Sequence, residues 1–372
     1  MSARAALPDI VRLVALFGIA AVNVQFFAHP SELGFVSAAQ QTPPDQAATW
    51  LVAGLATFKT YGLFAFMFGV GLAYQMGSAA RSDAPMWDSY RRRLLGLTAL
   101  GLFHAAFLYF GDILVVYALM GLLLFRWRDV PPPLLVRRAY WLIGAQVVFG
   151  ALVLGLLLAL PTDPETAALE ATLMTSGGFW DIAANRFVFF LIAFVPLVLM
   201  QGLAALGWFC LGLAAAKSGM IACPDHPLWS RARRVLLPIG VTLSLGAAAI
   251  AHWGDPVLGN PLVLAFAPIA TLGYLGLLAY IAQRADALPA GLLRAGRASL
   301  SIYLGQSIVL SLIFMPYGLG LWEQVGPATS VFIALGVTLG LVLALSGWLR
   351  VARLGPFEWV LRRITYRQPA LT

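Results

Sequence analysis

Long apolar stretches separated by short polar segments dominate the chain. A helix needs about 20 mainly apolar residues to cross the hydrocarbon core of a bilayer, and about ten stretches come close to that length. The pattern predicts membrane helices over residues 8–28, 48–77, 91–110, 112–127, 134–160, 184–216, 231–252, 259–283, 292–315 and 327–350. No connection approaches the size of a domain. We therefore expect an all-α, polytopic helical bundle with a single transmembrane domain over residues 1–372.

The charged residues predict how this bundle is oriented. Basic residues gather in every second connection and acidic residues in the others, with Arg186 as the main exception. Cytoplasmic loops of membrane proteins carry an excess of Lys and Arg. The basic connections, such as the one with Arg91, Arg92 and Arg93, are therefore predicted to be cytoplasmic. Basic residues near both ends of the chain place both termini in the cytoplasm, as an even number of helices requires.

The composition excludes an ordinary soluble domain, because 60% of the residues are hydrophobic and 11% are charged, against about 25% charged in soluble domains. We interpret the net charge of +8 as topology and contact with the lipid bilayer, with no nucleic acid as partner. Cys210 and Cys223 lack the spacing of a metal site, so no metal is expected. Arg12 and Asn23 interrupt the first apolar stretch, which favours a first membrane helix over a cleaved signal peptide.

The hairpin Gly101–Tyr117 carries a histidine and an aspartate into an otherwise apolar region. Ionisable groups inside a membrane are costly and often functional, so His104 and Asp112 are candidate catalytic residues. The charge pattern places His104 in the outer half of the membrane and Asp112 at the outer surface. Structural roles remain open, since Asp112 follows Gly111 and can cap the next helix, and His104 can be a packed, hydrogen-bonded histidine.

Three further candidates lie on or just after the first helix. Arg12 is one turn from Asp9, so the two form either a structural ion pair or part of a cationic mouth for a phosphate-bearing donor. Asn23 lies about 16 Å further along the helix and either orients a substrate or bonds a neighbouring helix. His29 follows at the outer interface, where it is either a general base or a solvated loop histidine.

Polar residues elsewhere extend this set. Lys59 lies near the middle of the membrane, where it either lines a polar cavity or pairs with an acid such as Asp112. Arg186 and Gln306 are expected at a similar depth to His104, on the outward side. Lys59, Arg186 and Gln306 are candidate substrate-binding residues. Arg12, Arg92 and Arg93 are candidate donor-binding residues.

Several motifs, in the same order, resemble the YeiB-like membrane proteins, the family of domain of unknown function 418. They cover nearly the whole chain and run from Asp9-Ile-Val-Arg12 and Val22-Asn23 through Phe64–Gly71, Gly101-Leu-Phe-His104, Gly111-Asp112-Ile-Leu, Gly296–Ser307 and Gly355–Tyr366. Two positions depart from the family pattern. Leu13 replaces the glycine that usually follows the arginine, and His29 is not expected to be histidine across the family.

This resemblance implies a multi-pass protein of the bacterial cytoplasmic (inner) membrane, related to the transmembrane acyltransferases. In the similar acyltransferase-3 enzymes the first helix carries an arginine, ten residues and then a histidine. Arg12 fits this pattern, whereas Asn23 occupies the histidine position. The similar heparan glucosaminide acetyltransferases match at Val22-Asn23 and keep a histidine slightly beyond, which His29 resembles.

The resulting hypothesis is an acyltransferase with acyl-CoA as donor and a small molecule, glycan or lipid as acceptor at the outer face. Arg12 and the Arg92–Arg93 pair would bind the CoA phosphates, and His104 or His29 would act as base, oriented by Asp112 and Asn23. The acyltransferase hypothesis predicts a cavity that runs from Arg12 and Arg92 to His104. Two alternatives stay open, a transporter with a buried relay of Arg, Lys, His and Asp, and a membrane scaffold. A homodimer is also compatible with the sequence.

Overall fold

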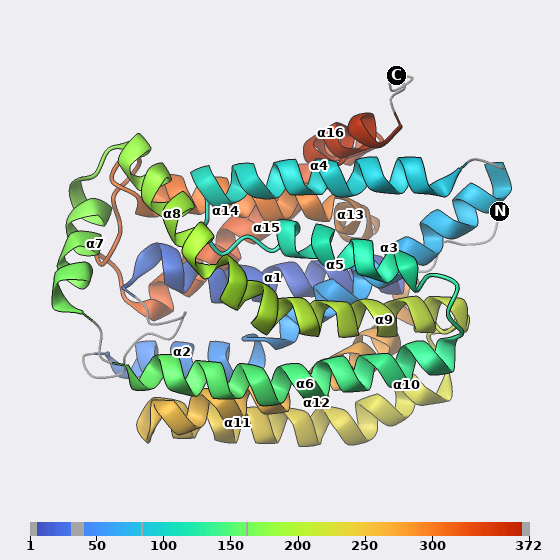
Figure 1. Cartoon of the computed structure of the whole chain (residues 1–372), viewed down its shortest axis with the longest axis horizontal. Helices are drawn as coiled ribbons and strands as arrows, with labels where there is room; N and C mark the ends of the chain where they lie inside the picture. Colours follow the sequence, from blue (N-terminus) through green and yellow to red (C-terminus); the bar gives the residue numbers. More distant parts are fainter. Residues whose placement is uncertain (1–5, 31–40, 83–84, 161–162, 367–372) are drawn as a thin grey trace.

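The computed structural model describes residues 6–30, 41–82, 85–160 and 163–366. Every regular element in these residues is a helix, and they contain no β-strand. Most of the long helices run along the longest axis of the molecule, side by side (Figure 1). The prediction of an all-α helical bundle is therefore confirmed.

The α-helices are α1 (Leu7–Ala28), α2 (Pro43–Leu55), α3 (Lys59–Ser82), α4 (Met86–Phe107), α5 (Leu114–Arg126), α6 (Pro132–Ala159), α7 (Pro164–Ser176), α8 (Phe179–Leu197), α9 (Leu203–Lys217), α10 (Pro227–Arg231), α11 (Leu237–Trp253), α12 (Pro256–Ala282), α13 (Ala290–Ala295), α14 (Ser299–Phe314), α15 (Pro327–Val351) and α16 (Pro356–Tyr366). Two π-helical turns, η2 (Val198–Gly202) and η3 (Ala232–Leu236), and two 3₁₀ turns, η4 (Ala285–Ala287) and η5 (Gly296–Ala298), join some of them. Prolines open many of these helices, where their missing N–H and fixed φ are harmless.

Eight helical spans in the described part of the chain are long and apolar enough to cross a membrane. The other two predicted segments are also helical but fall short of that standard. α4 contains the three consecutive arginines Arg91–Arg93, and α5 has only 13 residues. The chain is therefore a multi-pass membrane protein, in which α4 and α5 complete the ten predicted segments.

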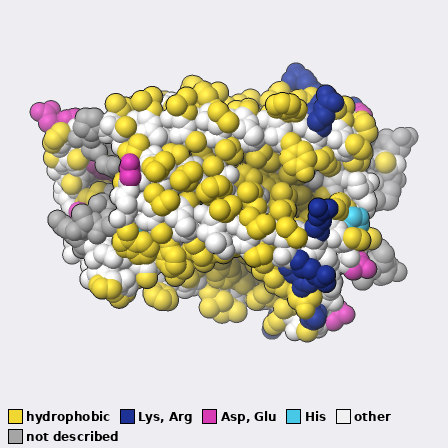
Figure 2. All heavy atoms as spheres, turned by 90° about the horizontal axis from the view of Figure 1, so that it is seen from below, with side chains coloured by type: hydrophobic (Ala, Val, Ile, Leu, Met, Phe, Trp, Pro, Cys, Tyr) yellow, Lys and Arg dark blue, Asp and Glu magenta, His cyan; other side chains and the backbone are white. Residues whose placement is uncertain are grey.

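The surface agrees with a membrane environment. Figure 2 shows a broad band of hydrophobic side chains, with Lys and Arg gathered at one end of this face. Large apolar side chains such as Trp141, Val148 and Leu152 of α6 are at least 70% exposed, as expected for a helix that faces lipid. By the excess of basic residues in cytoplasmic loops, we take the arginine-rich end as the cytoplasmic end and the opposite end as the outer end.

Several predicted helices are not continuous α-helices. Those predicted over 231–252 and 292–315 contain the turns η3 and η5, and two others are interrupted as follows. The segment predicted over 48–77 consists of α2 and α3, which break at residues 56–58, where Phe58 has a φ of 65°. The segment predicted over 184–216 consists of α8, η2 and α9. Pro196 lies at the end of α8 and cannot donate a backbone hydrogen bond, which explains the switch to a π-helical turn there. Both interruptions border a cavity described below.

The interior is organised around α1, which contacts α3, α12, α14 and α15. Glycines allow two other helices to approach very closely. A Cβ atom on Gly69 of α3 would lie 2.0 Å from the carbonyl oxygen of Phe209, and one on Gly212 of α9 would lie 1.9 Å from that of Phe66. Such close approach at glycines is typical of packing between membrane helices.

Candidate functional site

A buried histidine links the α4–α5 hairpin to α14. Nδ1 of His104 lies 2.9 Å from Oδ1 of Asp112, and its Nε2 lies 2.8 Å from Oγ of Ser307. His104 and Asp112 are 0% exposed and Ser307 is 2% exposed. An ionised Asp112 can only accept hydrogen bonds, so Nδ1 then carries a proton and Nε2 accepts the hydrogen of the Ser307 hydroxyl. The three groups stand in the order of a nucleophile, a base and an orienting acid.

Local backbone structure fixes Asp112 in this array. Its Oδ2 accepts a hydrogen bond from the backbone N–H of Val115 at 2.9 Å, so Asp112 also caps the start of α5. Gly101 of α4 makes room for the carboxylate, because a Cβ atom there would lie 2.6 Å from Oδ2. Pairing and capping, which the sequence left as alternatives, therefore occur together.

The predicted depth of Asp112 is wrong. The residue was expected at the outer surface, yet it is fully buried. The connection of residues 108–113 turns back into the bundle before the short α5 begins (Figure 1). The charge rule assigns a connection to a side of the membrane, but it says nothing about how far the connection folds inward.

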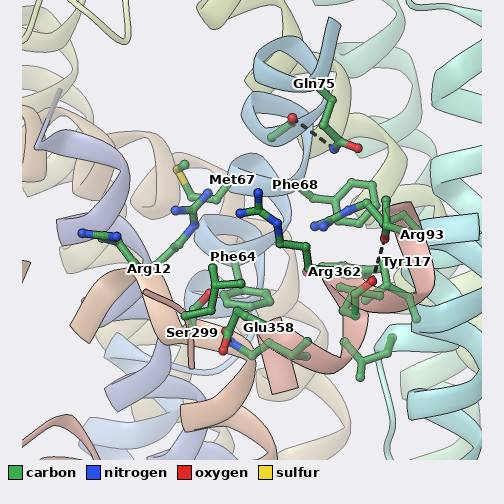
Figure 3. Close-up of a pocket in the computed structure, with 18 of the residues that line it drawn as sticks. Arg12, Phe64, Met67, Phe68, Gln75, Arg93, Tyr117, Ser299, Glu358 and Arg362 are labelled. Atoms are coloured by element: carbon green, nitrogen blue, oxygen red, sulfur yellow. Dashed lines mark hydrogen bonds between the residues drawn. The ribbon is translucent and has the colours of Figure 1, made fainter. Parts of the chain in front are cut away.

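The second feature is a cavity of about 350 Å³ at the arginine-rich end, which we call the arginine cavity. Its lining includes Arg12 of α1, Arg93 of α4, Arg297 of η5 and Arg362 of α16. Figure 3 shows three of these, Arg12, Arg93 and Arg362, around the cavity that Phe64 also lines. Segments far apart in the sequence thus bring four guanidinium groups to one space.

Few acidic groups oppose these arginines. Among the residues that line the arginine cavity, only Glu358 is acidic. Its Oε1 accepts hydrogen bonds from the backbone N–H groups of Leu300 at 2.7 Å and Ser301 at 3.2 Å, at the start of α14. Burial raises the pKa of Glu358, and these hydrogen bonds oppose the shift. Arg12 also pairs with Asp9 at 3.4 Å, so the ion pair, one of the two alternatives that the sequence left open, is present. The cavity keeps an excess of positive charge, which favours an anionic ligand.

A third feature is a cavity of about 270 Å³ in the outer half, which we call the outer cavity. Its lining is mainly hydrophobic, with a few polar groups that include Asn23 of α1 and Gln146 of α6. Both helix interruptions border it, since Phe58 and Pro196 are among its lining residues. An apolar cavity with a few polar groups suits an amphipathic molecule.

Four aromatic side chains stand between the two cavities, and we call them the aromatic wall. Phe64 and Tyr117 line the arginine cavity, whereas Tyr61 and Tyr303 line the outer cavity. The ring centroids of Tyr61 and Tyr117 are 5.7 Å apart, and those of Phe64 and Tyr303 are 6.5 Å apart. The expected continuous cavity from the arginines to His104 is therefore replaced by two cavities on opposite sides of a wall.

His104, Asp112 and Ser307 lie next to Tyr303 of the aromatic wall. The ring centroid of His104 is 4.9 Å from that of Tyr303, and Tyr303 precedes Ser307 by four residues, about one turn, on α14. Gly111 and Ile113, the two neighbours of Asp112, line the outer cavity. His104 and Ser307 are thus separated from the outer cavity by little more than the Tyr303 side chain.

Comparison with known proteins identifies the family. A family model described as "Protein of unknown function (DUF418)" matches residues 215–368. The uncharacterized protein YxaH of Bacillus subtilis (strain 168) is 30% identical over 388 aligned residues, which cover 96% of this chain and 93% of YxaH. The chain belongs to the DUF418 family. The uncharacterized protein YeiB of Escherichia coli (strain K12) is 29% identical over 383 residues, covering 96% of this chain and 95% of YeiB. No solved structure matches this DUF418 chain.

The predicted donor-binding residues of this DUF418 protein separate in the structure. Arg12 and Arg93 both line the arginine cavity. Arg92 points elsewhere, and its Nε donates to the carbonyl oxygen of Thr365 in α16 at 2.7 Å. The arginines of the cavity that the prediction missed are Arg297 and Arg362. Arg297 belongs to a recognised motif, but only the fold shows that it lines the same cavity as Arg12.

The remaining predicted residues hold helices together. Lys59 is buried and donates to the carbonyl oxygen of Ala53 at 2.9 Å, at the end of α2, so Asp112 is not its partner. Arg186 donates to the carbonyl oxygen of Phe107 and to the Tyr317 hydroxyl, both at 3.1 Å.

Gln306 and His29 also make helix-to-helix hydrogen bonds. Gln306 donates to the carbonyl oxygen of Leu16 at 3.2 Å and to the Thr338 hydroxyl at 2.9 Å, which ties α14 to α1 and α15. Its neighbour Ser307, which the prediction missed, faces His104 instead. His29 is 8% exposed, and its Nε2 lies 3.2 Å from the hydroxyl oxygen of Ser330 on α15. Burial lowers the pKa of His29, and Asp45 partly opposes this shift.

Proposed function

We propose that this protein is an acyltransferase of the bacterial cytoplasmic membrane, which takes an acyl group from cytosolic acyl-CoA and passes it to an acceptor at the outer face. The observation that carries the proposal is the arginine cavity, where four arginines meet one acidic residue. CoA carries a pyrophosphate and a 3′-phosphate, and arginine binds phosphate oxygens through paired, charge-assisted hydrogen bonds. A neutral or cationic solute would gain nothing from such a lining.

The apolar side of the arginine cavity suits the other end of the donor. Phe64, Phe68 and Tyr117 line it together with the arginines. A donor whose phosphates bind the arginines can therefore place its pantetheine and acyl groups against the aromatic wall. The outer cavity reaches the same wall from the other side, through Tyr61 and Tyr303, and supports binding of the acceptor there.

Of the two predicted bases, the geometry favours His104. Its Nδ1 is held by Asp112, which leaves Nε2 to take a proton from a hydroxyl, as its contact with Ser307 illustrates. Neither histidine lines either of these cavities, but the ring of His104 lies 4.9 Å from that of Tyr303, which lines the outer cavity, whereas His29 contacts Ser330 of α15. In the transfer, the base removes a hydroxyl proton as the thioester carbonyl is attacked and returns it to the departing CoA thiolate.

One observation favours a second candidate, a transporter. Two cavities that approach one layer of side chains from opposite sides resemble the arrangement needed for alternating access. Transport and acyl transfer predict different outcomes. Transport predicts gradient-driven uptake of an anionic solute without chemical change, and this uptake would be lost in Asp112→Asn if His104 and Asp112 carry the protons.

Release of CoA from acyl-CoA tests the proposal. The purified protein in nanodiscs would be supplied with acetyl-CoA or palmitoyl-CoA and an extract of envelope glycans and lipids, and free thiol would be followed with time. We expect release that depends on the extract and falls about 100-fold or more in His104→Gln, the range expected for loss of a general base. Release equal in the wild type and His104→Gln, or no release with either donor, would contradict the proposal.

A further inference from the structure

We infer that Ser307 carries the acyl group covalently between donor and acceptor, with His104 as its base and Asp112 as the group that orients His104. The inference rests on the proposed acyl transfer. It starts from distances of 2.8 Å between Ser307 Oγ and His104 Nε2, and 2.9 Å between His104 Nδ1 and Asp112 Oδ1. A serine hydroxyl is a weak nucleophile alone, and a hydrogen-bonded base that is itself oriented by a third group activates it.

The side-chain hydrogen bond of Ser307 leaves its own helix, as do those of Ser301 and Ser311 on α14, and among these three serines Ser307 is the one that contacts an imidazole. Ser and Thr side chains inside membrane helices commonly donate to the carbonyl oxygen one turn earlier. Thr60, Thr98 and Thr338 all do so, to the residue four positions before each. The hydrogen bond recorded for Ser307 goes to His104 instead. Capping of α5 accounts for Oδ2 of Asp112, but it does not require the pairing of Oδ1 with His104 or the contact of His104 with Ser307.

The separation of the two cavities is the second argument. The aromatic wall keeps a donor in the arginine cavity from touching an acceptor in the outer cavity. A covalent carrier removes the need for contact, because donor and acceptor then react in turn. Tyr303 belongs to the wall, and its ring lies 4.9 Å from His104 and 6.5 Å from Phe64 of the arginine cavity. The inference requires Tyr303 to rotate, so that Ser307 meets the donor and the acceptor in turn.

The two half-reactions balance. In the first, Ser307 Oγ attacks the thioester carbonyl carbon, His104 Nε2 takes the hydroxyl proton, the carbon–sulfur bond breaks, and the CoA thiolate takes that proton from His104. In the second, a hydroxyl or amine of the acceptor attacks the acyl-serine carbonyl and gives its proton to His104. The bond to Ser307 Oγ then breaks, and Oγ takes the proton back. No oxidant, reductant or metal is needed.

The experiment uses the full chain in nanodiscs without any acceptor. The protein would be incubated with acetyl-CoA or palmitoyl-CoA and analysed by intact-mass and peptide mass spectrometry. We expect one acyl group on the peptide that contains Ser307, a loss of this label in Ser307→Ala, and a decrease of about 100-fold or more in His104→Gln. Exchange of isotope between free CoA and acyl-CoA should occur in the wild type and be absent in Ser307→Ala.

Ser311→Ala is the matched control. Ser311 lies one turn further along α14, is also 2% exposed, and donates to the carbonyl oxygen of Leu108 at 3.1 Å. Its variant should be acylated like the wild type. Ser307→Cys, which keeps a nucleophile, should form a thioester at the same position, and thermal melting of each variant would separate loss of chemistry from loss of folding.

Each failure has a distinct meaning. Binding of CoA without acylation or isotope exchange would overturn the carrier role of Ser307 and leave direct transfer from donor to acceptor. Acylation of a residue other than Ser307 would overturn the assignment. A wild-type protein that fails to bind CoA at all would contradict the proposed function and the carrier role together.

Discussion

At the residue scale, sequence reasoning singled out His104 and Asp112 but missed their partner Ser307. An ionisable group in an apolar helix is visible in the sequence, so His104 and Asp112 were predictable. A serine in a helix is ordinary, and its importance depends on which neighbour its face of the helix meets. Gln306 and Ser307 are adjacent, yet Gln306 faces α1 and α15 whereas Ser307 faces His104. That choice of face depends on tertiary packing and is absent from the local pattern.

Glu358 gives a prediction at the same scale, because burial raises its pKa above the ordinary value of 4.5. The folded state therefore binds this proton more tightly than the unfolded state does. The stabilising contribution is complete below pH 4.5 and is lost as the pH rises through the raised pKa. Glu358→Gln keeps a neutral side chain at every pH. The melting temperature of this variant in detergent should exceed that of the wild type by an amount that grows from pH 4 toward neutrality, and a gap that is constant or shrinks would contradict the assignment.

At the element scale, the sequence predicted where helices lie better than where they break. The interruption at residues 56–58 contains no proline or glycine, and the apolar pattern continues across it. Polar residues at Thr57, Lys59 and Thr60 are the only local signal. The break leaves carbonyl oxygens in the last turn of α2 without a partner in the helix. The buried ammonium group of Lys59 donates a hydrogen bond to one of them, that of Ala53. Hydropathy averages over such breaks, which explains why one helix was predicted instead of two.

The close packing of α4 against the start of α5 gives a test at this scale. In Gly101→Ala the new methyl group would lie 2.6 Å from Asp112 Oδ2 and 2.9 Å from the backbone nitrogen of Val115. Since neither the cap nor the backbone can move freely, we expect a loss of about 1–3 kcal/mol in the free energy of unfolding. Gly336→Ala on α15 is the control, because no atom lies within 4 Å of the added group. Thermal melting that ranks the two variants equally would contradict the close approach.

At the scale of the whole molecule, charge and hydropathy predicted the bundle but not its cavities. The alternation of basic and acidic connections agrees with the position of the arginines at one end (Figure 2). The arginine cavity, however, joins Arg12 to Arg297 and Arg362, which lie hundreds of residues further along the chain. Neither charge counting nor helix counting places such residues next to one another. The aromatic wall could not be predicted either. In the sequence its aromatic residues look like ordinary core residues, and only the structure shows a cavity on each side of them.

The native cysteines provide a test of orientation. Cys223 is exposed between α9 and α10, at the end predicted to be cytoplasmic, whereas Cys210 is buried. A membrane-impermeant maleimide should therefore label the protein in inside-out vesicles and leave it unlabelled in right-side-out vesicles. Cys223→Ser should abolish labelling, since the chain contains two cysteines in all. Labelling in right-side-out vesicles would reverse the assigned orientation and place the arginine cavity on the outer side.

The most direct measurement of the central claim is calorimetric titration of CoA into the protein in nanodiscs, with pocket variants compared with a matched surface variant. We predict that the wild type binds CoA and that Arg362→Gln and Arg12→Gln each weaken binding about tenfold or more, the loss expected for a charge-assisted contact to phosphate. Arg91→Gln, which changes an exposed arginine paired with Asp88, should bind like the wild type. Absence of CoA binding, or equal weakening by all three variants, would contradict the account.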